Sequence, residues 1–277
     1  MQTQAPILII GKNGKTGARV NQRLQALGYT PRAVSRSTTP SFDWENSATW
    51  LAAIQGTRTA YVTYQPDLAI PNAETTIKNF VKLARENGLE HIVLLSGRGE
   101  EGAQRAEKIL QESGISWTIL RCSWFCQNFS ESFMLEGVLT GELVLPEADT
   151  LEPFVDADDI ADVAVAALTE PGHQNRLYEL TGPRAINFAQ CAEEISEALG
   201  RPVTYTPVPV NTYIAAMDGQ GQPKELQWLI RELFTVVFDG RNSQVKNGVE
   251  QALGRPATDF KTYVQKTLAS GAWSTPQ

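Results

Sequence analysis

The stretch Ile7-Leu8-Ile9-Ile10-Gly11-Lys12-Asn13-Gly14-Lys15-Thr16-Gly17 decides the fold of this chain. Four apolar residues precede a loop with three glycines, and apolar residues then recur at helical spacing from Val20 to Leu27, before Gly28. The pattern predicts a strand, a tight turn and a helix. Glycine permits a positive φ or the close approach of a phosphate, and the N–H groups that begin a helix attract anions. The loop is therefore predicted to bind a phosphate group.

Two phosphate-binding motifs compete for this loop. Gly14-Lys15-Thr16 is similar to the end of a nucleotide-triphosphate P-loop, but that motif requires a glycine at position 9, where this chain has isoleucine. No later strand ends in a clear magnesium-binding aspartate. The spacing Gly-x-x-Gly-x-x-Gly is instead a variant of the dinucleotide-binding fingerprint. We favour the dinucleotide interpretation; a turn that binds no ligand is the alternative.

Length and composition indicate an ordinary globular protein. The chain has 277 residues, of which 42 % are apolar and 20 % are charged, enough for a large domain with a smaller lobe. It lacks a membrane-length apolar run and a recognisable signal peptide, so we expect a cytoplasmic protein without membrane contacts. The net charge of −7 argues against binding to nucleic acid. Three cysteines without Cys-x-x-Cys spacing and two distant histidines predict no metal site.

Strands and helices alternate through the first half of the chain. Strands are expected at 32–35, 59–64, 91–95 and 115–120, with helices near 47–55, 72–87 and 100–113. This alternation predicts a doubly wound parallel sheet, the NAD(P)-binding Rossmann fold. The pattern becomes aromatic and irregular after Arg121, which indicates a second lobe. We therefore expect a Rossmann domain at 1–122, its sheet completed by about 153–182, and a smaller substrate-binding lobe at 123–152 and 183–277.

The later segments supply fewer regular elements. A short strand is expected at 143–146 and another at 177–180, and a C-terminal helix at 226–237. A further helix is expected to begin near Asp156, with acidic residues in its first turn, where the helix dipole favours them.

The end of the second expected strand bears on cofactor preference. Arg36 lies 19 residues beyond Gly17, where Rossmann proteins that prefer NAD carry an acidic residue for the ribose hydroxyl. An arginine there suits the 2′-phosphate of NADP, so we predict NADP(H) to be preferred over NAD(H). A solvated surface arginine is the alternative. Asp43 and Trp44 follow in a short strand-like segment, where they can accept a hydrogen bond from adenine and cover its ring.

The order of these motifs resembles the NmrA-like family of atypical short-chain dehydrogenases, which includes quinone oxidoreductases, triphenylmethane reductases and isoflavone-type reductases. Its ergot-alkaloid branch, the agroclavine and festuclavine dehydrogenases, is the most similar. The resemblance covers about residues 6–265. It rests on Gly11–Gly17, Ser35-Arg36, Asp43-Trp44, Glu107 with Leu110, Trp117–Arg121, Asn128 and Val155–Ala161.

The resemblance implies an NADP(H) site and a small-molecule substrate. The residues implied for the pyrophosphate are Asn13, Gly14, Lys15 and Thr16. Arg36 is implied for the 2′-phosphate, Asp43 and Trp44 for adenine, and Thr63, Tyr64 and Gln65 for the nicotinamide ribose. Further candidates for cofactor binding are Gly11, Gly17, Ser35 and Ser96. Ser96 is the candidate catalytic residue; a satisfied strand-end hydroxyl is the alternative. Trp124, Phe125 and Asn128 are candidates for the wall of the substrate pocket, with core packing as the alternative for the aromatic residues.

One departure from the family of short-chain dehydrogenases affects the expected reaction. Those enzymes carry Tyr-x-x-x-Lys followed four residues later by a glutamate; with that glutamate at Glu107, the two catalytic positions hold Gly99 and Ala103. The tyrosine moves a proton to or from a carbonyl oxygen, and a quinone or a preformed iminium ion accepts hydride without it. We therefore predict an NADPH-dependent reductase of a small electrophilic acceptor. The alternative is a non-catalytic NADP(H) sensor that acts on a protein partner. A serine hydrolase is set aside, because Ser96 lacks the first glycine of a nucleophile elbow.

Overall fold

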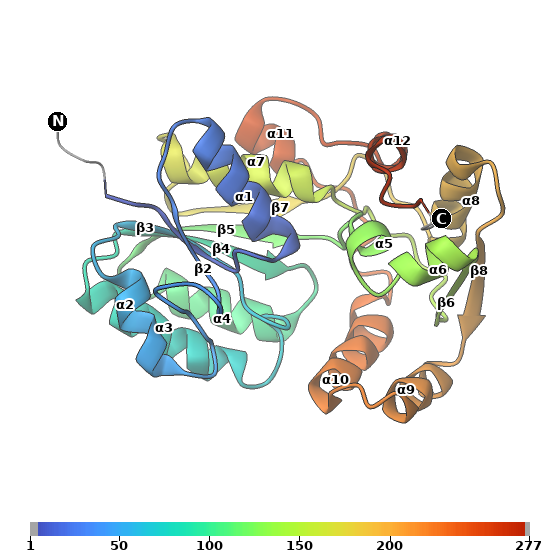
Figure 1. Cartoon of the computed structure of the whole chain (residues 1–277), viewed down its shortest axis with the longest axis horizontal. Helices are drawn as coiled ribbons and strands as arrows, with labels where there is room; N and C mark the ends of the chain where they lie inside the picture. Colours follow the sequence, from blue (N-terminus) through green and yellow to red (C-terminus); the bar gives the residue numbers. More distant parts are fainter. Residues whose placement is uncertain (1–4, 275–277) are drawn as a thin grey trace. The chain divides into compact units, whose positions relative to one another are not determined.

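The computed structural model describes residues 5–274, which form two compact units (Figure 1). The first unit contains residues 5–122, Ala157–Leu180 and Gly248–Arg255. The second contains Ser123–Asp156, Thr181–Asn247 and residues 256–274. The chain therefore passes back and forth between the units, and neither is a single continuous segment.

The first unit is built on a six-stranded parallel sheet with the order β2-β1-β3-β4-β5-β7. Its strands are β1 (Leu8–Ile10), β2 (Arg32–Val34), β3 (Thr59–Val62), β4 (His91–Gly97), β5 (Ser116–Cys122) and β7 (Arg176–Leu180). The strand order reverses between β1 and β3, and open sheets of this kind bind ligands beyond the carboxyl ends of the strands at that point. The predicted doubly wound parallel sheet is confirmed.

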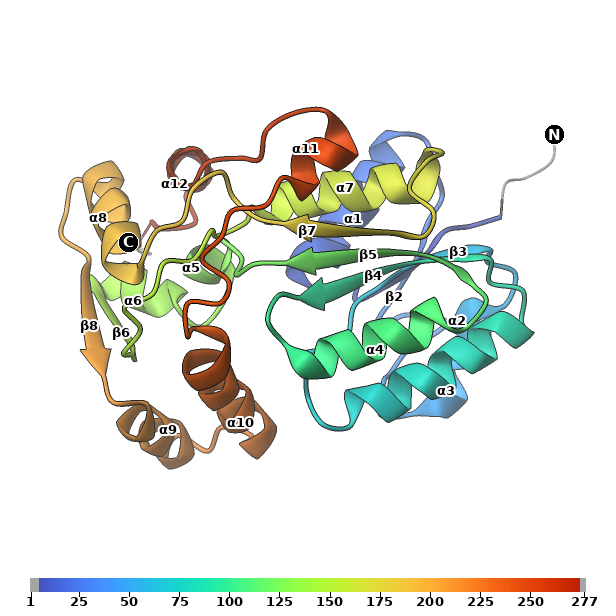
Figure 2. The same cartoon turned by 180° about the vertical axis from the view of Figure 1, so that it is seen from behind.

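Helices cover both faces of this sheet. Figures 1 and 2 show α1, α7 and α11 over one face and α2, α3 and α4 over the other. Their bounds are α1 (Lys15–Ala26), α2 (Trp50–Ile54), α3 (Ala73–Glu86), α4 (Glu101–Gln111), α7 (Ala157–Thr169) and α11 (Gly248–Leu253), and a 3-10 turn, η1 (Ser47–Thr49), precedes α2. Gly28 follows α1 with φ +86°, a conformation that glycine adopts readily and that ends the helix as expected.

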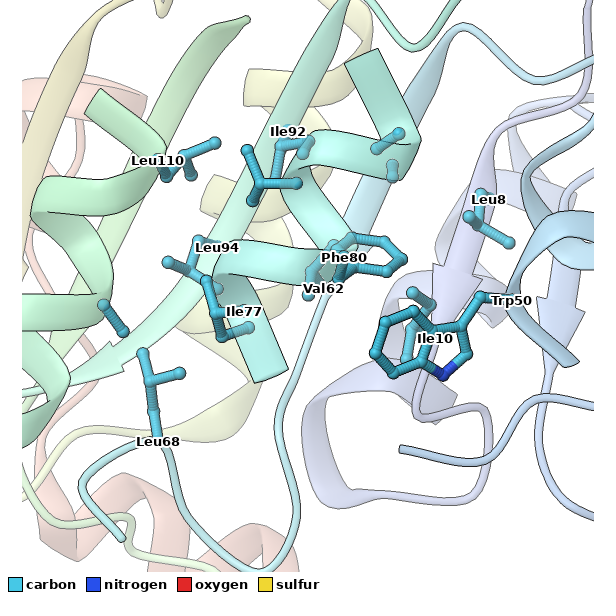
Figure 3. Close-up of a cluster of buried hydrophobic side chains, with 14 of the residues drawn as sticks. Leu8, Ile10, Trp50, Val62, Leu68, Ile77, Phe80, Ile92, Leu94 and Leu110 are labelled. Atoms are coloured by element: carbon cyan, nitrogen blue, oxygen red, sulfur yellow. The ribbon is translucent and has the colours of Figure 1, made fainter. Parts of the chain in front are cut away.

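The core on the α2–α4 face comes from alternate residues of the central strands. Leu8, Ile10, Val62, Ile92 and Leu94 pack with Ile77 and Phe80 of α3 and with Trp50 (Figure 3). The intervening residues Ile9 and Tyr61, which lie opposite each other in the β1–β3 register, point to the other face and are also fully buried. Because both faces are covered, the central strands β1 and β3 and most of β4 are nearly continuous apolar runs.

The second unit consists mainly of helices around an aromatic core. Its elements are α5 (Asn128–Glu131), α6 (Leu135–Thr140), β6 (Glu142–Pro146), α8 (Phe188–Leu199), β8 (Thr204–Val208), α9 (Val210–Gly219), α10 (Lys224–Glu232), a π-helical turn, η2 (Leu233–Val237), and α12 (Phe260–Ser270). The predicted strand at 143–146 is present, and it pairs in parallel with β8, which the sequence did not reveal. Thr206-Pro207-Val208 at the end of β8 lacks a clear alternating pattern, so its partner decides its conformation.

Phe42-Asp43-Trp44 was expected to be strand-like and is instead a turn. Asp43 forms only an isolated antiparallel bridge with Asn46, and its side chain accepts a hydrogen bond from the Glu45 N–H at 3.1 Å. This local bond closes the backbone on itself, so the β-forming residues Phe42 and Trp44 have no neighbouring strand with which to pair.

Among residues 5–274, none of the helices has both the length and the apolar character needed to cross a membrane.

Both histidines lie in one hydrogen-bonded network near the amino ends of β4, β5 and β7. His91 Nδ1 is 2.9 Å from Ser116 Oγ, and His91 Nε2 is 3.3 Å from Thr118 Oγ1, which donates to the carbonyl of His173 at 2.7 Å. His173 Nδ1 in turn lies 2.9 Å from the Tyr178 hydroxyl. Burial lowers the pKa of His91 below its ordinary value. Burial therefore favours the neutral form of His91 in the folded protein.

This network predicts that the folded protein loses stability in mild acid, at pH values above those at which carboxylates titrate. Below about pH 6.5 an unfolded histidine gains a proton that folded His91 resists, so the free energy of unfolding should fall by up to about 1.4 kcal/mol per pH unit. We expect urea unfolding to show a larger loss between pH 7.5 and pH 5.5 for the wild type than for His91→Gln. Equal losses in the two proteins would contradict this role of His91.

Candidate cofactor site

The glycine loop between β1 and α1 is closed by two contacts that exclude any side chain. Gly11 has φ +93°, and a Cβ there would lie 2.1 Å from Thr63 Oγ1, which itself donates to the carbonyl of Ile10 at 3.1 Å. A Cβ at Gly17 would lie 2.2 Å from the carbonyl oxygen of Gly11. The loop itself therefore requires glycine at both positions, whether or not a ligand is bound.

Gly14 differs from the other two glycines. It has φ −78° and ψ 162°, an extended conformation that any residue can adopt, and a Cβ there would approach only the Gly11 carbonyl oxygen, at 3.3 Å. Gly14 is the N-cap residue of α1 and, without a side chain, cannot accept a hydrogen bond from the N–H groups of the first turn. The first turn of α1 also contains no acidic residue. The space above Gly14 thus faces the N–H groups and the positive dipole end of the helix. These features fit a pyrophosphate group.

We predict that Gly14→Val abolishes NADP(H) binding while leaving the fold largely intact, because the new side chain would fill the space that the pyrophosphate needs. Calorimetry measures the affinity, and thermal unfolding measures the stability. Gly11→Val is the matched control: its positive φ and the contact with Thr63 should destabilise the fold itself. Undiminished cofactor affinity in Gly14→Val would show that the loop is only a turn.

Arg36 lies in a tight turn directly after β2. The N–H of Lys12 donates to the carbonyl of Val34 at 3.2 Å, so the glycine loop and the end of β2 are adjacent. The Ser35 N–H donates to Thr38 Oγ1 at 2.9 Å, which closes the turn and leaves Arg36 exposed. Within residues 5–274, no hydrogen bond or ion pair engages the Arg36 guanidinium.

The Arg36 turn also presents two hydroxyl groups. Ser35 Oγ and Ser37 Oγ are 3.1 Å apart, and the N–H of Ser37 donates to Ser35 Oγ at 3.3 Å. Ser37 was not among the residues expected from the sequence, although its place directly after Arg36 is a signal that could have identified it. A guanidinium flanked by hydroxyls suits a phosphate group.

Trp44 connects the turn after β2 to the end of β3. Its indole N–H donates to the carbonyl of Thr63 at 3.0 Å, and its ring lies 4.9 Å from that of Tyr64. Phe42, Trp50 and Phe80 surround the same indole. The structure therefore brings together Trp44, Thr63 and Tyr64, while Gln65 is exposed. Asp43 lies beside Trp44 with its Oδ1 used in the local turn.

Ser96 is already engaged by a buried ion pair. Its hydroxyl donates to Glu107 Oε1 at 2.6 Å, and Glu107, which is 1 % exposed, also accepts from Arg121 Nε at 3.0 Å and from the Arg121 terminal nitrogen. The hydrogen bond to Glu107 raises the pKa of Arg121, which keeps the guanidinium charged. This arrangement is the satisfied hydroxyl considered as the alternative. A catalytic role for Ser96 stays a prediction that requires this bond to open.

The two positions assigned to the tyrosine and lysine pair have structural roles. Gly99 has φ +75° in the turn between β4 and α4, and Ala103 is fully buried in the core.

Two carboxyl groups lie at the same edge of the sheet: Asp67 accepts from the Ala69 N–H at 2.8 Å and is hydrogen-bonded to the carboxyl of Glu100, which is buried. Burial raises the pKa of Asp67 above its ordinary range. The sequence pattern did not reveal this pair of carboxyl groups.

The candidates for the pocket wall lie in the second unit. Trp124 is 9 % exposed, and its ring packs edge to face against Phe234 and Phe238 at 5.3 and 4.6 Å. Core packing therefore accounts for Trp124. Phe125 and Asn128 are half-buried. Their role in binding a substrate stays a prediction.

Comparisons with known proteins define the class of this protein. The family model described as NAD(P)H-binding matches residues 11–171, so the first unit carries an NAD(P)H-binding domain. The model of the NmrA-like family matches residues 103–268. The chain belongs to the NmrA-like family, as the order of its motifs indicated.

Relatives and solved structures agree with this assignment. The chain is 29 % identical to an NAD(P)H azoreductase of Xenophilus azovorans, over 95 % of this chain and 98 % of the relative. It is 26 % identical to agroclavine dehydrogenase of Claviceps fusiformis, over 93 % and 96 %. An Escherichia coli NADPH-dependent quinone oxidoreductase complexed with NADPH has the same fold, with a TM-score of 0.78 and 20 % identity over 95 % of this chain and 99 % of that one. The family therefore contains NAD(P)H-dependent oxidoreductases.

Proposed function

We propose that this protein is an NADPH-dependent oxidoreductase that transfers hydride to a small electrophilic acceptor of the quinone or iminium type. The proposal is supported by the positions of Gly14, Arg36 and Trp44. Gly14 lies in the loop after β1, Arg36 lies in the turn after β2, and the Trp44 indole is bonded to Thr63 directly after β3, so each is near the carboxyl end of a strand beside the switch point. A cradle for a diphosphate, a cation for a third phosphate and an aromatic wall are the parts that an NADP(H) site needs. Bound there, the nicotinamide cofactor supplies the hydride.

In this proposal the residues of the chain bind and orient the cofactor and do not themselves react. The first turn of α1 offers N–H groups to the diphosphate, and Lys12 and Lys15 add positive charge beside it. Arg36 with Ser35 and Ser37 holds the 2′-phosphate. Trp44, fixed by its bond to the Thr63 carbonyl, positions the segment that we assign to the ribose. Orientation of this kind supplies a large part of the rate in hydride transfer.

The acceptor class follows from the residues after β4. With Gly99 in a turn and Ala103 in the core, a tyrosine and lysine pair has no place at these positions. An acceptor that is already electrophilic does not need their proton transfer at the reacting carbon. The names of the relatives, an azoreductase, a clavine dehydrogenase and a quinone oxidoreductase, agree with acceptors of this kind.

NADPH should bind more tightly than NADH, because Arg36 can pair with a phosphate that NADH lacks. A charge-assisted contact of this kind is worth about 1.5–3 kcal/mol, or about 10- to 150-fold in affinity. Calorimetry should show that Arg36→Ala removes most of this ratio. Arg58→Ala is the matched control, since it removes the same charge from the residue that precedes β3 at the opposite edge of the sheet. Equal binding of both cofactors by the wild type would refute the assignment of Arg36.

Stopped-flow oxidation of bound NADPH by a panel of quinones, iminium ions and azo dyes tests the reaction itself. We predict that activity survives Tyr64→Phe with a loss smaller than the about 10²- to 10⁴-fold that removal of a general acid costs. A variant that binds NADPH normally but loses three or more orders of magnitude would identify Tyr64 as the proton donor. If no acceptor oxidises bound NADPH, the non-catalytic NADP(H) sensor becomes the better description.

A further inference from the structure

The hydroxyl of Tyr61 is buried beneath the α1 face of the sheet without a hydrogen bond. Tyr61 lies on β3 between Ile9 and Val93 in the register of the sheet, and it is 0 % exposed. Within residues 5–274, its hydroxyl has no partner of acceptable geometry. Buried hydroxyls are nearly always paired, and an unpaired one costs about 1–3 kcal/mol. The cost suggests that Tyr61 has a partner only in another state of the protein.

The side chain beside this hydroxyl is Thr16, in the first turn of α1. Burial raises the pKa of the Tyr61 phenol strongly, and the neighbouring Thr16 hydroxyl opposes that rise. The two hydroxyls are thus close, although they do not form a hydrogen bond of ordinary geometry. Thr16 is 3 % exposed and is the second residue of a helix that begins at Lys15, the end of α1 that faces the space above Gly14. Thr16 is therefore near the Tyr61 hydroxyl and also belongs to the first turn of the helix that begins at the proposed diphosphate position.

We propose that Tyr61 is a positioning residue for the cofactor diphosphate: its hydroxyl donates to Thr16 Oγ1, and the Thr16 hydroxyl donates to a phosphate oxygen at the start of α1. This inference rests on the proposed function, since it requires the dinucleotide to bind at the glycine loop. An anion at that position turns the Thr16 proton outward and leaves a lone pair for Tyr61. A hydroxyl that accepts a hydrogen bond also donates a stronger one, so the two bonds reinforce each other.

The two hydrogen bonds from Tyr61 through Thr16 to the phosphate form a relay. This relay explains why the protein keeps a tyrosine at position 61 although its hydroxyl is unpaired when no cofactor is bound. In the cofactor-free protein a phenylalanine at position 61 would fill the same space without an unsatisfied group. In the bound protein, the tyrosine completes a chain from the sheet interior to the phosphate. The cofactor-free and cofactor-bound states therefore favour different residues at position 61.

Tyr61→Phe separates this proposal from a purely structural role, because two measurements should move in opposite directions. The cofactor-free variant should unfold about 2–4 °C higher than the wild type, since an unsatisfied buried group is removed. Its affinity for NADPH in calorimetry should fall about 2- to 10-fold, the effect of one lost hydrogen bond. Tyr178→Phe is the matched control: the Tyr178 hydroxyl is 2.9 Å from His173 Nδ1, so this change should lower the unfolding temperature and leave NADPH affinity unchanged.

A double-mutant cycle with Thr16→Val tests the connection between the two hydroxyls. If the relay exists, Tyr61→Phe should weaken NADPH binding by less than 1.5-fold in the Thr16→Val background, because the relay is already broken. Equal effects of Tyr61→Phe in both backgrounds would overturn the proposal. So would unchanged NADPH affinity in Tyr61→Phe alone, or a cofactor-free variant destabilised as much as Tyr178→Phe. A wild-type protein that does not bind NADPH would instead refute the proposed function.

Discussion

The arrangement of the first unit depends on the contact between the start of helix α1 and Gly11, the residue that follows strand β1. A Cβ at Gly17 would lie 2.2 Å from the Gly11 carbonyl oxygen, so the helix can approach the strand only because residue 17 is glycine. Thr63, directly after β3, closes the other side of Gly11. These contacts hold the positive end of the helix at the carboxyl edge of the sheet, where Arg36 and Trp44 are also placed.

Ion pairs on the flank of α1 join the helix to neighbouring segments and do not involve Arg36. Arg19 and Arg23 pair with Asp158 of α7 at 3.1 and 2.9 Å, and Arg255 reaches the buried Asp159 at 2.8 Å. Single exposed pairs stabilise little, but here several share partners across three segments. The arginines of α1 are thus neutralised by acids, whereas Arg36 is not. A net charge of −7 is therefore compatible with a locally positive edge.

The polar groups inside the first unit fall into two kinds. Ser96, Glu107 and Arg121 form a closed set in which each charge is matched, and such a set joins β4, α4 and β5 rigidly. Tyr61 is different, because its buried hydroxyl has no hydrogen-bond partner among the described residues. A group of this second kind can gain a partner when a ligand binds, whereas the set around Ser96 is already complete.

The sequence by itself determined the alternation of strands and helices, the glycine loop, the position of Arg36 at a strand end and the membership of the NmrA-like family. These features depend on neighbouring residues: hydrophobic periodicity, positive φ and the requirement for a missing Cβ act over a few positions. Only the tertiary structure decided that Phe42-Asp43-Trp44 is a turn anchored on Thr63, that Ser96 is engaged by Glu107, and that β8 pairs with β6. It also decided that the Tyr61 hydroxyl lies beside Thr16. The anchoring of Trp44, the bond of Ser96, the pairing of β8 and the placement of Tyr61 each depend on a partner outside the segment itself. A pattern of neighbouring residues does not encode which group elsewhere in the chain completes a hydrogen bond.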